Sequence, residues 1–506
     1  MGADFVVRWD DWSGGEYGVT DPAFSESNQW SGQNIMLYES GLVGVRPGMK
    51  LFATTGLPAA TTAPGPVGFD VYDESLIAVV DNPYRVPLAT GTAIQMGSYP
   101  VAATEFVRFS QADGVLYSVT TQDGKLYKHE NDTTVPITLP AGVALTDLTR
   151  WGYYLIGPDR DKPWRLYFSK VSEAGPEFDV WEDNAYVDVG SNLGINTMVP
   201  MFNSLLCGKK SGWWALSGVL GDNPYVRHVE MGNGPVDGRA AAGTTDNRVL
   251  YWSTEKVPHW FNGESVYLDE KYRIAGYQTG FPLDTVIATP TGRRMLMLGK
   301  PTDVDDPESL LIQQRGSWSA HALDDKLAGL APQDVRHGYG LPDGVIFGVN
   351  ETDVTDPIEI VSFEHDLQRP GHTDDLWAAP NDQGAVGLIN GALVTPAWFD
   401  AQGRMVMVRN IQIQFRKWTS GIPDSLNELH VKVRPLARWQ AGTINTDTQM
   451  WTEPSERAAG NGVDDSWSMN FGSQGYALGF QIEIPRMRGI AIREINVSCE
   501  VRSRRS

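Results

Sequence analysis

Residues 114–127 read GVLYSVTTQDGKLY, which is two short apolar runs on either side of an Asp-Gly turn. β-branched and aromatic residues favour strands, and such a turn between two apolar runs is typical of a β-hairpin. The same plan recurs along the chain, in the segments 75–80, 153–169, 204–216, 248–253, 294–312 and 344–361. The hairpin is therefore the repeating unit of the predicted fold.

The spacing of these segments predicts how they assemble. Successive segments are spaced about 45 residues apart, which is the length of one four-stranded propeller blade. A single hairpin cannot bury its apolar face, whereas blades in a ring bury theirs against their neighbours. Residues 53–385 are predicted to form a β-propeller of about seven blades. Because the repeats are degenerate, two consecutive β-sandwiches remain the alternative.

The last part of the chain has a different pattern. Apolar residues alternate with Arg and Gln between Val406 and Phe415, and residues 480–484 read FQIEI. This period of two is typical of antiparallel strands with one buried face. Residues 386–506 are predicted to form a C-terminal antiparallel β-sandwich of the jelly-roll or immunoglobulin type, after a turn-rich linker at 366–391.

Residues 1–52 are predicted to be an N-terminal arm and hairpin that join the propeller. Trp9, Trp12 and Trp30 lie in a polar, turn-rich stretch and are interpreted as anchors of an extended arm. The apolar runs 35–38 and 42–45 flank a short turn, which indicates a hairpin. The whole chain is thus expected to be all-β.

Composition limits the partners. The net charge is −21, which disfavours tight binding of nucleic acid, because phosphates are contacted mainly by Lys and Arg. Cys207 and Cys499 fall in different predicted domains, so we expect two buried free thiols. No apolar run approaches the ~20 residues that span a bilayer, and the N-terminus lacks a signal-peptide pattern. We expect no integral membrane segment and synthesis in the cytoplasm.

Motifs of the common enzyme classes do not occur: there is no His-Glu-x-x-His, no Gly-x-Ser-x-Gly and no phosphate-binding Gly-rich loop. The acidic turns 303–306 and 353–356 lack the Gly and the distal Glu of an EF-hand. The histidines are scattered, at positions 129, 228, 259, 321, 337, 365, 372 and 430. We predict a protein that is not an enzyme, with no catalytic, cofactor-binding or metal-ligating residues and no cofactor.

Two aromatic groups are candidates for stacking on sugar rings: Trp213-Trp214 and His259-Trp260-Phe261. Packing between blades is the favoured interpretation of both. The C-terminal region is locally basic through Arg404, Arg409, Arg416, Arg434 and Arg438. These arginines either face solvent or dock on an acidic partner subunit.

Two stretches resemble virion proteins of tailed bacteriophages, in the family of propeller-type tail nozzle and tail-tip (minor tail) proteins. The first comprises Trp12-Ser13-Gly14-Gly15 and residues 34–48, NIMLYESGLVGVRPG. The second comprises residues 189–196, VGSNLGIN, and residues 205–216, LLCGKKSGWWAL. We find neither the long adaptor-like helical segment nor the inserted platform domain of the nozzle pattern, so a place at the tail tip is equally open. No functional residue is transferred from the resemblance.

The resemblance implies a structural component of a phage tail, as nozzle, hub or tail-tip protein, acting in tail assembly and DNA delivery. Its location would be the virion tail, after synthesis in the host bacterial cytoplasm. Its partners would be other tail proteins and copies of itself in a homo-oligomer, and DNA would pass an acidic lining without tight binding.

Two alternatives stay open. The first is a host-receptor or glycan-binding tail protein, whose C-terminal sandwich would mediate host attachment by binding cell-surface polysaccharide. The second is a propeller hydrolase with paired axial carboxylates, which a linear sequence does not reveal.

Overall fold

The computed structural model has strands and turns throughout the part of the chain that it describes. Those residues are 4–13, 15–16, 29–33, 35–37, 41–45, 49–53, 57, 68–80, 82–87, 92–98, 106–121, 123–190, 192–201, 203–236, 238, 240–243, 247–255, 257–268, 285–288, 294–299, 309–314, 317–322, 338–341, 344–349, 359–364, 391–395, 398–399, 404–417, 428–429, 432–435, 457–458, 464–470, 474–475, 477–484 and 490–501. The all-β prediction is confirmed for these residues.

Four-stranded antiparallel sheets follow one another from residue 68. The first four are β7 (Gly68–Tyr72), β8 (Ser75–Val80), β9 (Asn82–Pro87) and β10 (Ile94–Gln95); β11 (Val107–Ala112), β12 (Val115–Thr120), β13 (Lys125–Glu130) and β14 (Thr133–Ile137); β15 (Thr149–Trp151), β16 (Tyr154–Pro158), β17 (Arg165–Ser172) and β18 (Gly175–Asp188); and β19 (Thr197–Met201), β20 (Ser204–Lys209), β21 (Gly212–Val219) and β22 (Asn223–Met231).

Three further sheets have the same plan. They are β23 (Ala241–Gly243), β24 (Val249–Trp252), β25 (Pro258–Phe261) and β26 (Val266–Leu268); β27 (Thr285–Ala288), β28 (Arg294–Gly299), β29 (Ser309–Gln314) and β30 (Ser317–Ala322); and β31 (Gly338–Leu341), β32 (Gly344–Val349), β33 (Glu359–Glu364) and β6 (Met49–Ala53). Each segment predicted from the sequence coincides with the second strand of one sheet, or with its second and third.

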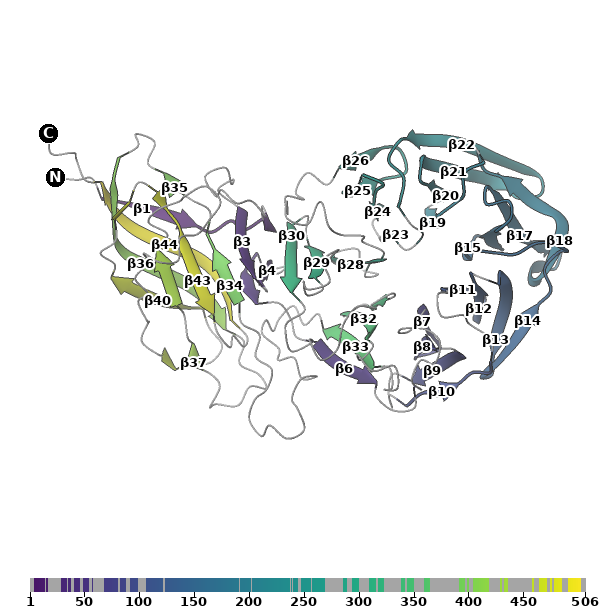
Figure 1. Ribbon diagram of the computed structural model, residues 1–506, viewed down its shortest axis with the longest axis horizontal. Coiled ribbons are helices and arrows are strands. Elements are labelled where there is room, and N and C mark those ends of the chain that lie inside the picture. Colours follow the sequence, from purple (N-terminus) through teal and green to yellow (C-terminus); the bar gives the residue numbers. More distant parts are fainter. Residues whose placement is uncertain are drawn as a thin grey trace.

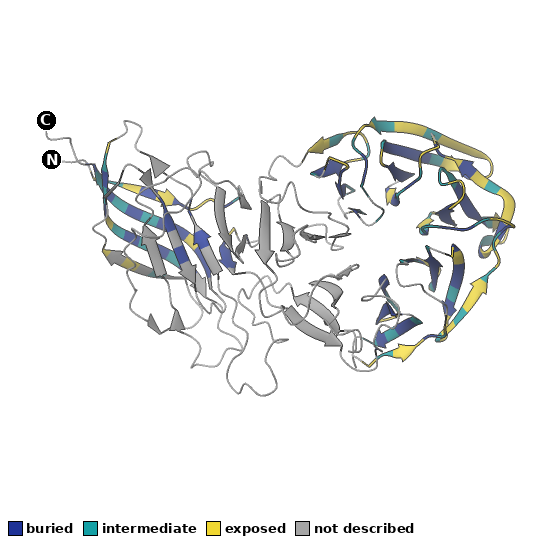
Figure 2. Ribbon diagram, viewed as in Figure 1, coloured by how far each residue is buried: buried dark blue, intermediate teal, exposed yellow. Residues whose placement is uncertain are grey.

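The sheets surround a common axis. The first strands β7, β11, β15, β19, β23, β27 and β31 contact one another in this order, and β31 contacts β7. Figure 1 shows β7, β11, β15, β19 and β23 toward the middle of the ring and β14, β18 and β22 at its rim. In the sheets between β7 and β26, the second and third strands are largely dark blue in Figure 2, and the rim strands β14 and β22 are largely exposed. This propeller-like ring is not what two consecutive sandwiches would give.

A strand from before the ring completes its last sheet. β6 pairs antiparallel with β33, with Leu51 opposite Val361 and Met49 opposite Phe363. Three strands of this sheet therefore come from the end of the ring segment and one from the N-terminal region. The pairing ties the two ends of the ring together.

The C-terminal strands form two larger sheets with strands from the N-terminus. One contains β1 (Asp4–Trp9), β4 (Ile35–Leu37), β5 (Val43–Val45), β36 (Val406–Lys417), β40 (Asp464–Asn470), β41 (Gln474–Gly475) and β44 (Ile490–Val501). The other contains β2 (Gly15–Glu16), β3 (Gln29–Gln33), β34 (Gly391–Val394), β38 (Lys432–Pro435) and β43 (Phe480–Ile484). Two short pairs accompany them, β35 (Trp398–Phe399) with β42 (Ala477–Leu478) and β37 (Glu428–Leu429) with β39 (Arg457–Ala458).

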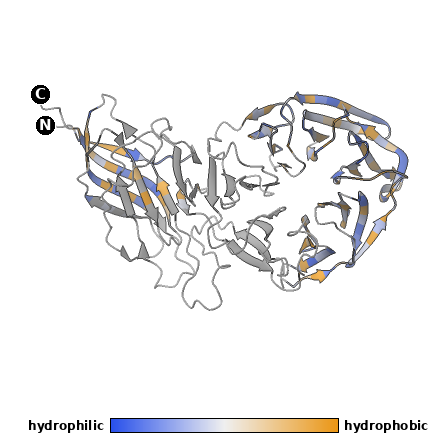
Figure 3. Ribbon diagram, in the orientation of Figure 1, coloured by the Kyte–Doolittle hydropathy of each residue, from blue (hydrophilic) through white to orange (hydrophobic). Residues whose placement is uncertain are grey.

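These two sheets share one hydrophobic core. Trp9 of β1 packs edge-on against Phe480 of β43, with ring centroids 5.9 Å apart. The same cluster contains Ile411 and Ile413 of β36 and Ile495 of β44, all essentially fully buried. Strands β36 and β44 alternate hydrophobic and hydrophilic residues in Figure 3, as the period of two predicted.

The N-terminal arm joins this unit, which corrects the assignment of residues 1–52 to the propeller. β1 pairs with β44 over Asp4–Trp9, β4 and β5 form the predicted hairpin and pair onward to β44, and only β6 joins the ring. The physical reason is the alternation in β1, where Phe5, Val7 and Trp9 point inward and need an apolar sheet face.

Aromatic anchoring of the arm is confirmed at two positions. Trp9 and Trp12 are 4% and 1% exposed, and the Trp12 indole N–H donates to the carbonyl of Arg493 at 3.2 Å. The unit contacts the ring through β30, which lies against β2, β3 and β4 (Figure 1). Residues 366–390, most of the predicted linker, lie outside the described residues.

Candidate functional site

One face of the ring collects the segments that link successive sheets. In each sheet the first strand starts at this face and the second strand returns to it, because neighbours are antiparallel. The turn between second and third strands therefore lies on the same face as the linkers. We call it the linker face.

The linkers are fixed to the turns of the preceding sheet. The Leu145 N–H donates to the Gly124 carbonyl at 2.9 Å, and the Ile195 N–H donates to the Pro163 carbonyl at 2.8 Å. In the third instance, a Cβ at Gly234 would overlap the carbonyl oxygen of Lys209, so the glycine permits the close approach. The linker face is thus a preorganised backbone surface.

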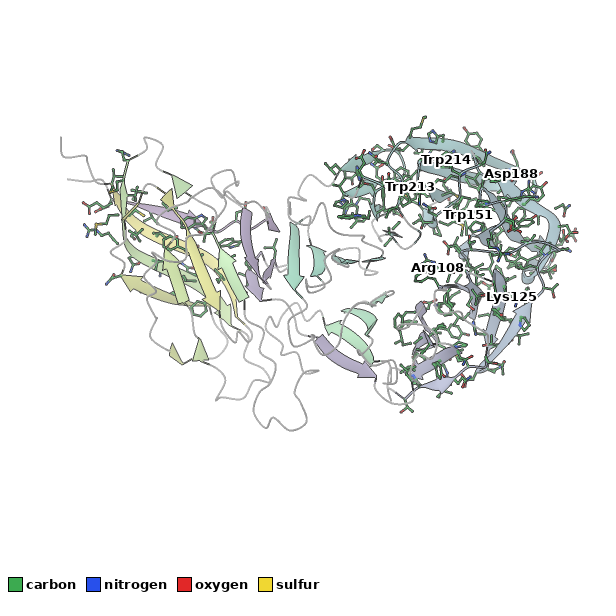
Figure 4. All side chains as sticks on the ribbon, viewed as in Figure 1. Arg108, Lys125, Trp151, Asp188, Trp213 and Trp214 are labelled. Atoms are coloured by element: carbon green, nitrogen blue, oxygen red, sulfur yellow. The ribbon has the colours of Figure 1, made fainter. Side chains whose placement is uncertain are left out.

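A charged pair lies on this face near the axis. Arg108 is the second residue of β11, and its Nε lies 3.8 Å from Oδ1 of Asp147, which precedes β15. Figure 4 shows Arg108 extending from β11 toward the middle of the ring. Its Nη2 lies 3.1 Å from where a Cβ would stand on Gly238, beside the carbonyl of Asn196. Segments leading into three different sheets therefore surround one guanidinium.

The environment of Asp147 opposes its charge. Its side chain is 18% exposed. Burial raises the pKa of Asp147, while the Arg108 guanidinium and the Leu148 N–H act in the opposite direction. The Leu148 N–H donates to Asp147 Oδ1 at 2.8 Å, which fixes the carboxylate on the linker.

The neighbouring arginine is engaged elsewhere. Arg150 of β15 bonds Asp113 in the first turn of the preceding sheet at 2.8 Å, and its guanidinium lies 5.6 Å from the Phe178 ring. It connects two sheets on the opposite face. Of these two arginines on innermost strands, Arg108 is the one at the linker face.

A serine, a histidine and a threonine form a buried chain in the second sheet. Ser118 Oγ lies 2.7 Å from His129 Nε2, and His129 Nδ1 lies 3.0 Å from Thr134 Oγ1. Thr134 donates its single proton to the Met96 carbonyl at 2.6 Å, so its oxygen accepts from Nδ1–H and Nε2 accepts from Ser118.

This row of hydrogen bonds through Ser118, His129 and Thr134 has a structural role. Burial lowers the pKa of His129 to about 4, so the imidazole is neutral at pH 7. Ser118 and His129 are both 0% exposed. A nucleophile and base need access to a substrate, so this serine–histidine contact cannot serve hydrolysis in the folded ring.

The aromatic candidates lie inside the ring. Trp213 is fully buried, stacked on Phe261 with ring centroids 5.2 Å apart, and Trp214 is 8% exposed beside His228. His259 and Trp260 are each 5% exposed. The interpretation as packing residues is confirmed, and neither group offers an open ring face to a sugar.

A charged residue, Lys209, lies in the same buried region. Its ammonium is fully buried, donates to the carbonyl of Val189 and lies 4.9 Å from the Trp214 ring. Burial lowers the pKa of Lys209 to about 8. The tryptophan and the carbonyl replace part of the lost hydration of the cation.

Both cysteines are free and buried, as expected. Cys207 lies in β20 of the ring and Cys499 in β44 of the other unit. Burial raises the pKa of each thiol to about 12, so both remain protonated at neutral pH.

Several candidates are only partly placed. The turns 303–306 and 353–356, Arg438 and the histidines 337, 365, 372 and 430 lie outside the described residues, and His321 is described as backbone in β30. Arg409 forms an ion pair with Glu500, whereas Arg404 precedes β36 and Arg416 and Arg434 lie in β36 and β38.

Among the described residues, no group of three His, Cys, Asp or Glu side chains could hold a metal ion. Nor does the described chain contain a helix long and apolar enough to cross a membrane.

Sequence reasoning missed Arg108, Asp147 and the His129 chain. Their only sequence signal is position, since Arg108 and Asp147 stand at or just before the start of first strands. That signal becomes readable only after the strand boundaries are known.

Comparison with known proteins gives no family. No protein-family model and no curated protein matches the chain. Among solved structures, the computationally designed protein Ika8 is similar over 69% of this chain and 99% of its own, at 11% identity and TM-score 0.39. BamB from Moraxella catarrhalis follows with 63% and 98% coverage, 10% identity and TM-score 0.38.

A third structure has comparable similarity. It is a putative 6-phosphogluconolactonase from Bacteroides fragilis NCTC 9343, with 60% and 95% coverage, 12% identity and TM-score 0.38. At these values we take no role from any of the three proteins.

Proposed function

We propose that this chain is a structural component of a bacteriophage tail, a nozzle, hub or tail-tip protein whose rigid ring is a seven-bladed β-propeller and whose second unit is a β-sandwich. The observation that carries the proposal is the course of the N-terminal region. It supplies strands to both sheets of the C-terminal unit and then, through β6, the last strand of the ring. A chain secured at both ends in this way resists being pulled open.

One of the two stretches that resemble tail proteins includes this junction. Residues 34–48 contain both strands of the hairpin β4–β5 and lead directly into β6. This part of the resemblance thus falls on the segment that connects the ring and the C-terminal unit. Other tail proteins and copies of the same chain are the proposed partners. The net charge of −21 supports passage of DNA without tight binding.

Glycan binding is the weaker candidate. The tryptophans that would stack on sugars pack between sheets instead, with Trp213 fully buried. Turnover of cell-wall glycans would require exposed paired carboxylates, and near the described part of the axis Asp147 faces an arginine rather than a second acid.

A stop codon tests the proposal directly. Replacing the codon of Trp151 by an amber codon in the phage genome removes most of the ring in a non-suppressing host. We expect particles without a complete tail, and normal particles when the host carries a tryptophan-inserting suppressor. Infectious particles of normal morphology without the chain would overturn the proposal.

A further inference from the structure

Arg108 has more hydrogen-bonding capacity than its surroundings use. A guanidinium carries five N–H donors in a planar fork. Within the described residues its one charged partner is Asp147, and at 3.8 Å their contact is an ion pair longer than a hydrogen bond. No hydrogen bond from Arg108 to another described residue accompanies it.

Two other arginines of the ring are fully hydrogen-bonded to a carboxylate. Arg165 bonds Asp188 through two nitrogens at 2.7 and 3.0 Å, and Arg85 bonds Asp132 at 2.7 and 2.8 Å. Both are bidentate. Arg108 differs from them, because no carboxylate of the described residues accepts a hydrogen bond from its guanidinium.

The missing hydrogen bonds of Arg108 matter energetically because its side chain is largely buried. Its side chain is 21% exposed, so most of it is removed from water, and a buried charge without hydrogen bonds is costly. Arg108 is the second residue of β11 and so stands at the linker face. Gly238 contributes no side chain there, and a Cβ at that position would meet Nη2 at 3.1 Å. Nη2 therefore lies close to the backbone at Gly238.

We propose that Arg108 anchors an oxyanion-binding site on the linker face of the ring, near its axis. The ligand is a small phosphate or carboxylate whose two oxygens accept from the open guanidinium fork. Asp147 limits the affinity, because its carboxylate repels the anion and competes for the same nitrogens. The site is independent of the proposed function in the tail.

Inorganic phosphate and acetate, each against chloride at equal ionic strength, are the probes. Binding is measured by isothermal titration calorimetry on the full-length chain, with thermal unfolding as a second readout. We expect saturable binding to the wild type and at least a tenfold loss of affinity in Arg108→Gln. Arg165→Gln is the matched control. It removes an arginine whose guanidinium is already hydrogen-bonded to Asp188, so we expect it to keep wild-type affinity. The comparison of phosphate with acetate identifies the preferred oxyanion.

Asp147→Asn separates this site from a general effect of folding, since it leaves Arg108 in place. Removing the competing charge tightens anion binding by about threefold or more, whereas Arg108→Lys, which keeps the charge without the fork, weakens it. Binding no stronger than chloride in the wild type, equal affinity in Arg108→Gln, or weaker binding in Asp147→Asn would each overturn the proposal.

Discussion

Polar side chains buried in the ring join strands to one another. His129 connects β12 through Ser118 with β14 through Thr134, and Thr134 connects onward to Met96 after the first sheet. Both ring nitrogens of His129 are hydrogen-bonded. The neutral imidazole is therefore part of the folded structure and charges only at a cost.

The pH dependence of stability follows from this histidine. Its pKa is about 4 in the folded chain against 6.5 unfolded, so between these values the unfolded chain binds more protons. The free energy of unfolding therefore falls as the pH drops from 6.5 to 4, by about 1.4 kcal/mol per pH unit. Urea denaturation of the wild type and His129→Gln from pH 7 to 4.5 measures the difference, and the variant should have the shallower slope. Equal slopes would contradict this role for His129.

At the residue scale, the sequence predicted burial better than it predicted contacts. Trp213, Cys207 and Cys499 are apolar or weakly polar and were expected inside. Arg108 and Asp147 were not singled out, because 39 residues separate them in the sequence and only the ring brings them together.

At the scale of elements, β6 closes the ring. A proline at Leu51 lacks the backbone N–H and fixes φ, so it disfavours the ladder between β6 and β33. We expect Leu51→Pro to destabilise the protein by about 1–3 kcal/mol, the cost of a lost ladder hydrogen bond, whereas Leu51→Thr, which keeps the N–H and favours strands, has a smaller effect. Thermal unfolding and limited proteolysis measure both. Equal melting temperatures for Leu51→Pro and the wild type would show that the ring does not depend on β6.

The second and third strands of each sheet were predictable, since their apolar runs bury both faces. First and fourth strands were not, because strands such as β15 and β23 have only three residues and β14 and β22 are largely exposed. Their pairing is decided by the sheet next to them, not by local propensity. The same limit explains the error over residues 1–52, where a strand with one apolar face fits either unit until the partner edge is known.

At the scale of the whole molecule, the C-terminal unit is not continuous in sequence. Its core contains Val7, Trp9, Trp12, Leu37 and Val43 from the N-terminal region. Loss of a buried aromatic side chain costs about 3–5 kcal/mol, against a total stability of about 5–15 kcal/mol for a typical domain. We therefore expect that residues 386–506 alone do not fold stably.

Two fragments test this composite unit. We expect residues 386–506 alone to show no cooperative thermal transition by circular dichroism, and the same fragment with a peptide of residues 1–48 to regain one. A peptide with Trp9→Ala and Trp12→Ala is the control and should restore little. Cooperative unfolding of residues 386–506 by themselves would contradict the shared core. Any assay of glycan binding by the C-terminal unit must include the N-terminal strands.

Cryo-electron microscopy of intact particles, with the chain traced into the tail density, is the most direct measurement on the proposed role. We expect a symmetric set of rings at the distal end of the tail, each with its C-terminal unit beside the sheet that ends in β30. Particles that contain no copy of the chain would contradict a structural role in the virion.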